Sequence, residues 1–79
     1  MLCEVAFDKG AVSAPHAHPH EQISYVISGQ VAFRIGEQDI TLTSGDSCLM
    51  PPDVPHSATC LQDALVLDVF TPIREDFLR

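Results

Sequence analysis

The chain has 79 residues, and its eleven acidic and four basic side chains give a formal net charge of −7. This length allows one domain, residues 1–79, whose core alone is only marginally stable. The acidic balance makes nucleic acid and anionic membrane surfaces poor partners. No apolar stretch is long enough to span a membrane, and the N-terminus lacks the pattern of a signal peptide. We therefore expect a cytoplasmic protein, in which the three cysteines, an odd number, stay reduced.

Short runs rich in β-branched and aromatic residues alternate with turn signals along the chain. The strands expected from these runs are, in chain order, Leu2–Phe7, Ile23–Ser28, Val31–Ile35, Asp39–Leu42, Ser47–Met50 and Ala64–Phe70. The turn signals include Ser28-Gly29, expected as a tight turn, and Gln62-Asp63. This spacing predicts an all-β sandwich or barrel rather than β-α-β units. The only helix expected is a short one in the tail, over Ile73–Leu78.

The run Ala64–Phe70 is apolar on both of its faces. Residues two apart in a strand share a face, so Leu65, Leu67 and Val69 lie on one side. Val66, Asp68 and Phe70 lie on the other side. Such a strand is covered on both faces, so one face should look into the barrel and the other should meet a second sheet or a partner subunit. We expect a homodimer, because a chain this short leaves a sheet edge open that a second copy would cover, and Leu65, Leu67 and Val69 are candidates for the contact.

All four histidines lie in two short segments, residues 16–22 and 51–56. His16 and His18 are two residues apart, so within a strand both would face one ion. Pro19 interrupts that strand and lets the chain return with Gln22 near the same point. The second segment has prolines that stiffen a loop, from which His56 is delivered. Three imidazoles and one side-chain oxygen suit a divalent transition metal such as Ni, Zn, Mn or Fe.

The two segments resemble the paired motifs of the cupin family. His16, His18, Gln22 and Gly29 match the first motif in spacing, and Gly45, Pro51 and His56 match the second. Asp53 stands where the family usually has a second glycine, and Cys60 stands where an asparagine often follows. The resemblance implies a jelly-roll β-barrel with a metal held by four side chains: His16, His18, Gln22 and His56.

Two neighbours of these residues compete for a place at the metal. Glu21 is charged and adjacent to Gln22, but the family spacing favours Gln22. A glutamine, unlike a glutamate, leaves the charge of the ion uncancelled, and the ion is then a stronger Lewis acid. His20 lies in the expected turn after Pro19, and we expect it behind or beside the ligands rather than among them.

Residues 68–78 resemble the closing segment of the small cupins of pectin and uronate catabolism. Those proteins open the ring of unsaturated uronate monomers to give the linear keto form. The resemblance implies that Asp68, Phe70 and Arg74 line the pocket beside the metal. Independently, Asp68 interrupts an apolar strand, and a buried carboxylate is costly unless it is partnered or functional. An ion pair with Arg34 or Arg74, or a place at the exposed margin of the strand, is the alternative.

Roles follow for the residues of this expected pocket. Asp68 would move a proton as general base or acid. Arg74 would bind a substrate carboxylate through two parallel hydrogen bonds, although a surface pairing with a neighbouring acidic residue is the alternative. Phe70 and Tyr25 would contact the substrate, although packing in the core is the commoner explanation for both.

The resemblance thus implies a metal-dependent isomerase or lyase that opens the ring of a small acidic sugar such as an unsaturated uronate. One alternative is an Fe(II)-dependent dioxygenase, because three histidines and a neutral ligand also suit that chemistry. Another is a non-catalytic protein that binds a small ligand. The chain is also short for this family, so an N-terminal truncation is a further possibility.

Overall fold

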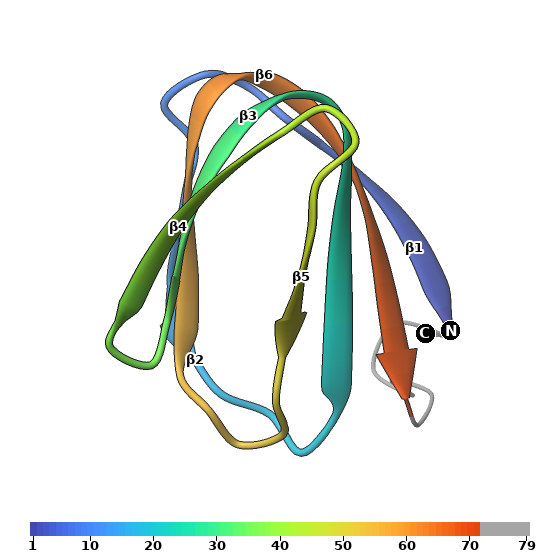
Figure 1. Ribbon diagram of the computed structural model, residues 1–79, viewed down its shortest axis with the longest axis vertical. Helices are drawn as coiled ribbons and strands as arrows, with labels where there is room; N and C mark the ends of the chain where they lie inside the picture. Colours follow the sequence, from blue (N-terminus) through green and yellow to red (C-terminus); the bar gives the residue numbers. More distant parts are fainter. Residues whose placement is uncertain (72–79) are drawn as a thin grey trace.

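The computed structural model describes residues 1–71, and that part of the chain consists of strands joined by turns and loops (Figure 1). The strands are β1 (Leu2–Phe7), β2 (Val12–His16), β3 (Glu21–Ile35), β4 (Gln38–Thr43), β5 (Ser47–Met50) and β6 (His56–Thr71). The expected all-β class is confirmed. The helix expected over Ile73–Leu78 lies outside the described residues.

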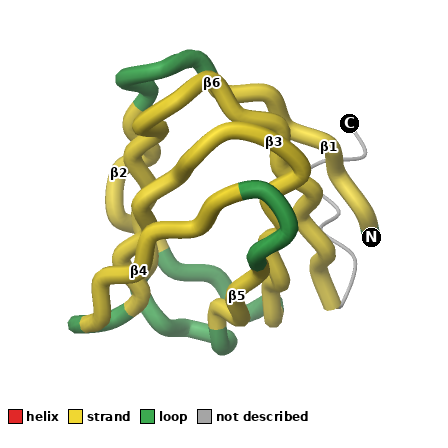
Figure 2. The backbone as a smooth tube through the Cα atoms, turned by 45° about the horizontal axis from the view of Figure 1, so that its top comes forward, coloured by secondary structure: helices red, strands yellow, loops and turns green. Residues whose placement is uncertain are grey.

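Two long strands, β3 and β6, form the frame of the barrel. They pair antiparallel along their whole length, from Glu21 opposite Thr71 to Ile35 opposite His56. β1 and β5 flank this pair along one half, whereas β2 and β4 flank it along the other half. Both long strands bend at mid-length, so the two halves curl toward each other around a common interior (Figures 1 and 2). This is a sandwich whose corners are made by strands that pass from one half to the other.

Gly29 is the residue at which β3 bends. Its φ is 87°, and the pairing with β6 shifts register on both sides of it. A Cβ at this position would lie 2.2 Å from the carbonyl oxygen of Asp63, so only glycine fits. The tight turn expected here is wrong, because the chain bends without reversing and β6 bends alongside it. The expected strands Ile23–Ser28 and Val31–Ile35 are therefore two halves of β3.

The other strand predictions differ mainly in length. β1 and β5 have the expected bounds, and β4 is longer than expected by one residue at each end. The expected strand Ala64–Phe70 is only the second half of β6, because Gln62-Asp63 lies at the bend rather than in a terminating turn. β2 is absent from the strands expected by residue range, since its sequence Val-Ser-Ala-Pro-His has low β propensity, and the strand assumed to hold both His16 and His18 ends at His16. Its proline is tolerated because β2 flanks the sheet and its register shifts there.

The interior has an apolar part and a polar part. The apolar cluster consists of Val26, Val31, Phe33, Leu42, Met50, Cys60, Ala64 and Val66. The buried polar side chains are His18, Gln22, Ser24 and His56. In the first half of β3 the alternation places Gln22, Ser24 and Val26 inside. The buried polar groups therefore come from the two histidine segments and the strand next to them.

Candidate metal centre and pocket

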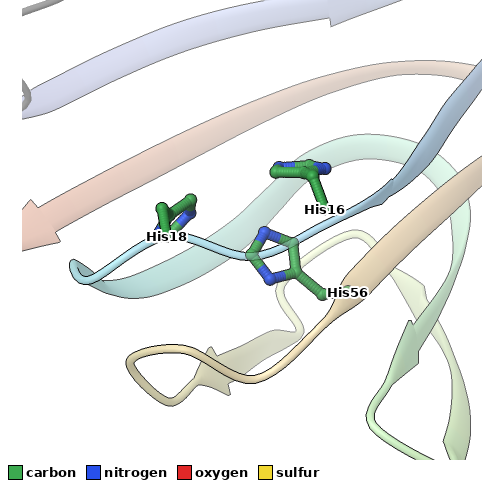
Figure 3. Close-up of side chains that lie close together, drawn as sticks. All are labelled: His16, His18 and His56. Carbon is green, nitrogen blue, oxygen red and sulfur yellow. The ribbon is translucent and has the colours of Figure 1, made fainter.

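Three histidine rings converge at one end of the barrel (Figure 3). His16 is the last residue of β2, His18 follows in the next loop, and His56 is the first residue of β6. One ring nitrogen from each lies within 4.8 Å of the others. We expected His16 and His18 to lie in one strand, but β2 ends at His16 and His18 lies in the loop that follows. Instead, His16 is paired directly with His56 across the two strands.

Hydrogen bonds to the backbone orient all three rings in the same way. The Nδ1 atoms of His16, His18 and His56 lie 2.9 Å, 3.0 Å and 3.1 Å from the carbonyl oxygens of Ala14, His20 and Val54. A carbonyl oxygen only accepts, so each Nδ1 carries the proton, and a neutral ring then has its lone pair on Nε2. Metal-binding histidines are held in this manner, with one ring N–H on a backbone carbonyl.

The Nε2 atom of His56 is buried and has no hydrogen-bond partner among the described residues. Burial lowers the pKa of His56 below its usual value, and the nearby His16 and His18 act in the same direction, against the hydrogen bond to Val54 and the charge of Asp68. A buried, unpaired lone pair is unfavourable unless a ligand satisfies it. The three imidazoles therefore fit a transition metal, since each presents a neutral nitrogen toward the same point.

Gln22 brings an oxygen to the same place. Its Oε1 lies 3.0 Å from Nε2 of His18, and its Nε2 donates to the hydroxyl of Ser24 at 3.0 Å. With His18 in the tautomer described above, two lone pairs face each other, which a cation would satisfy. Glu21 is exposed and lies on the other face of β3. The neighbouring oxygen beside the histidines thus belongs to Gln22.

Asp68 lies on β6 opposite Ser24, and its Oδ1 accepts a hydrogen bond of 2.6 Å from the Ser24 hydroxyl. Burial raises the pKa of Asp68, while hydrogen bonds from Ser24 and Gln22 and the charge of His56 oppose that rise. The ion pair with Arg34 that the sequence left open is not formed, because Arg34 pairs with Asp39 at 3.1 Å. Arg74 lies outside the described residues.

A cavity of about 160 Å³ opens beside these side chains. Its polar lining comes from His16, Gln22, Ser24, His56, Asp68 and two serines, Ser13 and Ser57. Its apolar lining includes Phe7, Phe33, Val66 and Phe70. A cavity of about 150 Å³ accommodates a benzene molecule. The space therefore suits a ligand group with a single six-membered ring.

The two aromatic residues predicted to contact a substrate lie on opposite faces of the barrel wall. Phe70 is buried, lines the cavity, and its ring centre is 5.9 Å from that of His18. Tyr25 is 41% exposed, and the alternation of β3 places it on the outer face with Glu21 and Ile23. The substrate-binding role predicted for Tyr25 does not fit this position.

Two further residues support the site. Ser24, which the sequence did not single out, is completely buried and bonds both Gln22 and Asp68. Its position two residues after Gln22 in a strand was the signal that it shares that face. His20 is outside the three-histidine cluster, but its carbonyl accepts the Nδ1 proton of His18. Its backbone thus holds a neighbouring ring.

All three cysteines are free thiols. Cys60 is buried, and burial together with the charge of Asp68 raises the pKa of the half-buried Cys48 to about 11. Residues 1–71 contain no helix of the length and apolarity needed to cross a membrane.

The family model described as the cupin domain matches residues 3–70, so the chain belongs to the cupin family. Within that family the chain is 39% identical to the pectin degradation protein KdgF of Dickeya dadantii, over 99% of this chain and 72% of the relative. The resemblance to the pectin-degradation cupins is thereby confirmed. A second relative, the H2HPP isomerase of Bacillus subtilis, is 34% identical over 70% of this chain, which corresponds to 24% of that protein.

Solved structures give the same result. An RmlC-like cupin from Shewanella frigidimarina superimposes with a TM-score of 0.94 at 43% identity, over 98% of this chain and 69% of that one. KdgF from Halomonas sp. superimposes with a TM-score of 0.88 at 39% identity, over 96% and 73% of the two chains. The expected cupin barrel is thus confirmed, and the chain spans about seven tenths of each of these proteins.

Proposed function

We propose that this cupin is a metal-dependent isomerase or lyase that opens the ring of a small acidic sugar, such as an unsaturated uronate monomer. The observation that carries the proposal is a cavity large enough for one ring, lined by His16, His56 and Asp68 together. The similarity to a pectin degradation protein over 99% of the chain supports the class of substrate.

Four side chains would hold the metal: His16, His18, Gln22 and His56. Their donor set accepts Ni, Zn, Mn or Fe. When bound, a divalent ion supplies Lewis acidity, which polarises an oxygen of the substrate. The neutral Nε2 atoms and the amide oxygen leave the charge of the ion uncancelled, so an anionic or carbonyl oxygen would be favoured beside it.

Three residues would act on the sugar itself. Asp68 lines the cavity, and its carboxylate would take a proton from a substrate hydroxyl and return it to the opened product. The buried ring of Phe70 would pack against the sugar and limit the access of water. Arg74, outside the described residues, would bind the substrate carboxylate through two hydrogen bonds.

The test is a ring-opening assay with an unsaturated uronate monomer, in which the reaction is measured as the loss of ultraviolet absorbance of the conjugated double bond. We expect activity with metal, none with a chelator, and recovery when the metal is restored. Asp68→Asn should lower kcat by at least about 100-fold, the usual contribution of a general acid or base. Tyr25→Phe, on the outer face, should change it little.

Metal-loaded protein that leaves such sugars unchanged would refute the proposed reaction. The alternative of an iron-dependent dioxygenase would then be tested by oxygen consumption after loading with Fe(II). Binding of a uronate without any turnover would instead indicate the non-catalytic alternative.

We further propose that the protein is a cytoplasmic homodimer. The outer ends of β1, β6, β3 and β5 carry one row of apolar side chains in register, Leu2, Val69, Ile23 and Leu49, and each is more than a third exposed. β1 and β5 are also the flanking strands of this half, so either could pair with a second copy. Ile23→Lys should give a monomer by light scattering, and an unchanged mass would argue against this face.

A further inference from the structure

A series of three polar contacts, of which the last two are hydrogen bonds, leads from the histidine cluster to Asp68. Oε1 of Gln22 lies 3.0 Å from Nε2 of His18, and the amide nitrogen of Gln22 donates to Ser24 at 3.0 Å. The hydroxyl of Ser24 donates in turn to Asp68 at 2.6 Å. Gln22 and Ser24 share the inner face of β3, and Asp68 is the cross-strand partner of Ser24 on β6. The strand register between β3 and β6 therefore fixes the relative positions of Gln22, Ser24 and Asp68.

In both hydrogen bonds the donor lies on the histidine side and the acceptor on the Asp68 side: Gln22 donates to Ser24, and Ser24 donates to Asp68. An ionised carboxylate only accepts, so Ser24 gives its single hydroxyl proton to Asp68. The Ser24 oxygen then has only lone pairs to offer Gln22, and these can be met by the amide NH₂ but not by the amide oxygen. The oxygen of Gln22 must consequently point the other way, toward the histidines.

Packing alone does not choose between the two orientations of the amide. The NH₂ group and the oxygen of a glutamine have nearly the same size, so a rotation of 180° about the last bond leaves the shape unchanged. The rotated side chain would set its oxygen against the Ser24 oxygen and beside the Asp68 carboxylate. It would also direct N–H groups at the cluster, where a metal needs a lone pair.

We propose that Ser24 and Asp68 are positioning residues that orient the amide of Gln22, so that its oxygen rather than its nitrogen faces the metal. This inference rests on the proposed metal centre. It gives Asp68 a role at the metal that requires no contact with the ion. It also accounts for the complete burial of Ser24 between two polar partners, Gln22 and Asp68.

Asp68 could instead assist the metal only through its negative charge. The variant Gln22→Glu separates the two explanations. A carboxylate presents an oxygen whichever way it is turned, so with glutamate at this position nothing needs orienting. In that background the charge of Asp68 still attracts a cation, but it also repels the new carboxylate.

The experiment measures the Zn²⁺ affinity of the full chain by competition with a chromophoric chelator. With Gln22 present, Asp68→Asn and Ser24→Ala should each weaken binding by about 10- to 100-fold, the usual cost of losing a group that supports a ligand. Glu21→Gln removes a nearby charge from the outer face and should change the affinity by less than about threefold, as for an exposed, solvent-screened charge. In the Gln22→Glu background, neither Asp68→Asn nor Ser24→Ala should weaken binding.

A spectroscopic readout accompanies the affinities. The visible spectrum of bound Co²⁺ reports the ligand set, so Asp68→Asn should shift it toward the spectrum of Gln22→Ala. Circular dichroism and thermal unfolding of the metal-free variants identify any variant that has lost its fold. If either Asp68→Asn or Ser24→Ala is unfolded, the affinity of the folded variant decides the inference.

Losses of affinity that are equal in both backgrounds would overturn the orientation argument in favour of charge alone. Unchanged affinity of Asp68→Asn and Ser24→Ala with Gln22 present would overturn it outright, while leaving the proposed function in place. A native protein that binds none of Zn²⁺, Ni²⁺, Mn²⁺ and Fe²⁺ would instead refute the metal centre, and the orienting role with it.

Discussion

The backbone N–H of Asp53 donates a hydrogen bond of 2.8 Å to the carbonyl oxygen of His18. This bond ties the loop before β6 to the loop after β2, and these are the two segments that carry the histidines. Asp53 makes it in a left-handed conformation, with φ of 64°. The family's usual glycine at this position would adopt the same conformation without strain.

Substitution of Asp53 tests this connection between the loops. Asp53→Gly should keep the conformation and change the free energy of unfolding by about 1 kcal/mol or less. Asp53→Val should cost about 2 kcal/mol, because β-branched residues strongly resist positive φ. It should also weaken Zn²⁺ binding, since the bond to His18 would be distorted. Urea unfolding and metal affinity are the measurements, and a fully tolerated valine would show that the loops are placed by other contacts.

Gly29 should be the least replaceable glycine in the described part of the chain. Gly29→Ala would combine positive φ with a Cβ 2.2 Å from a carbonyl oxygen, whereas Gly45→Ala would meet nothing within 4 Å at nearly the same φ. The backbone strain common to both is about 1–3 kcal/mol. We therefore expect Gly29→Ala either to unfold the protein or to cost at least about 2 kcal/mol more than Gly45→Ala in urea unfolding. Equal stabilities would contradict the close packing at the bend.

Alanine substitution of single histidines should show which of them bind the metal and that the neighbouring His20 does not. Metal at 100 times its Kd should stabilise the native protein by about 2.7 kcal/mol, seen as a rise in Tm. His56→Ala should abolish most of that rise, because it removes a ring nitrogen of the cluster. His20→Ala should retain most of it, since the backbone carbonyl that bonds His18 remains and the lost ring only packs against that of His18, at 5.5 Å between ring centres. The same loss in both variants would place His20 among the ligands.

Cys48 should react slowly with thiol reagents in the folded protein. Burial, and secondarily the charge of Asp68, raises its pKa from 9.0 to about 11. At pH 8 its thiolate fraction should be lower by about 100-fold than that of the unfolded chain. Alkylation by iodoacetamide, mapped by mass spectrometry in buffer and in urea, measures this directly. Equal rates in the two conditions at pH 8 would contradict the shift.

The same shift makes a contribution to stability that depends on pH. The folded state holds the Cys48 proton more tightly than the unfolded state, so the contribution is fully present below pH 9.0. It is lost as the pH rises from 9.0 to about 11. Cys48→Ala should remove this alkaline dependence, which urea unfolding at several pH values would show.

Much of the fold was predictable from local pattern. Runs of β-branched and aromatic residues between turn signals located β1, β4 and β5, and the two-residue period grouped Val66, Asp68 and Phe70 on one face of β6, which the structure places inside. The continuity of β3 and β6 was not predictable, because Gly29 next to a serine is an ordinary turn signal. Only the neighbouring strand, whose backbone lies where a Cβ would be, turns that glycine into a bend.

The sequence by itself indicated which residue types meet: three imidazoles and an amide from the spacing of the two motifs, and a carboxylate from the resemblance of the closing strand to that of the pectin-degradation cupins. It did so because ligand chemistry and the two-residue period of a strand are local properties. The tertiary structure decided what depends on distant neighbours. The register between β3 and β6 turns Gln22 inward and Tyr25 outward, and it sets Ser24 opposite Asp68. Strand alternation relates neighbours to one another, but only pairing across the sheet determines which face lies inside.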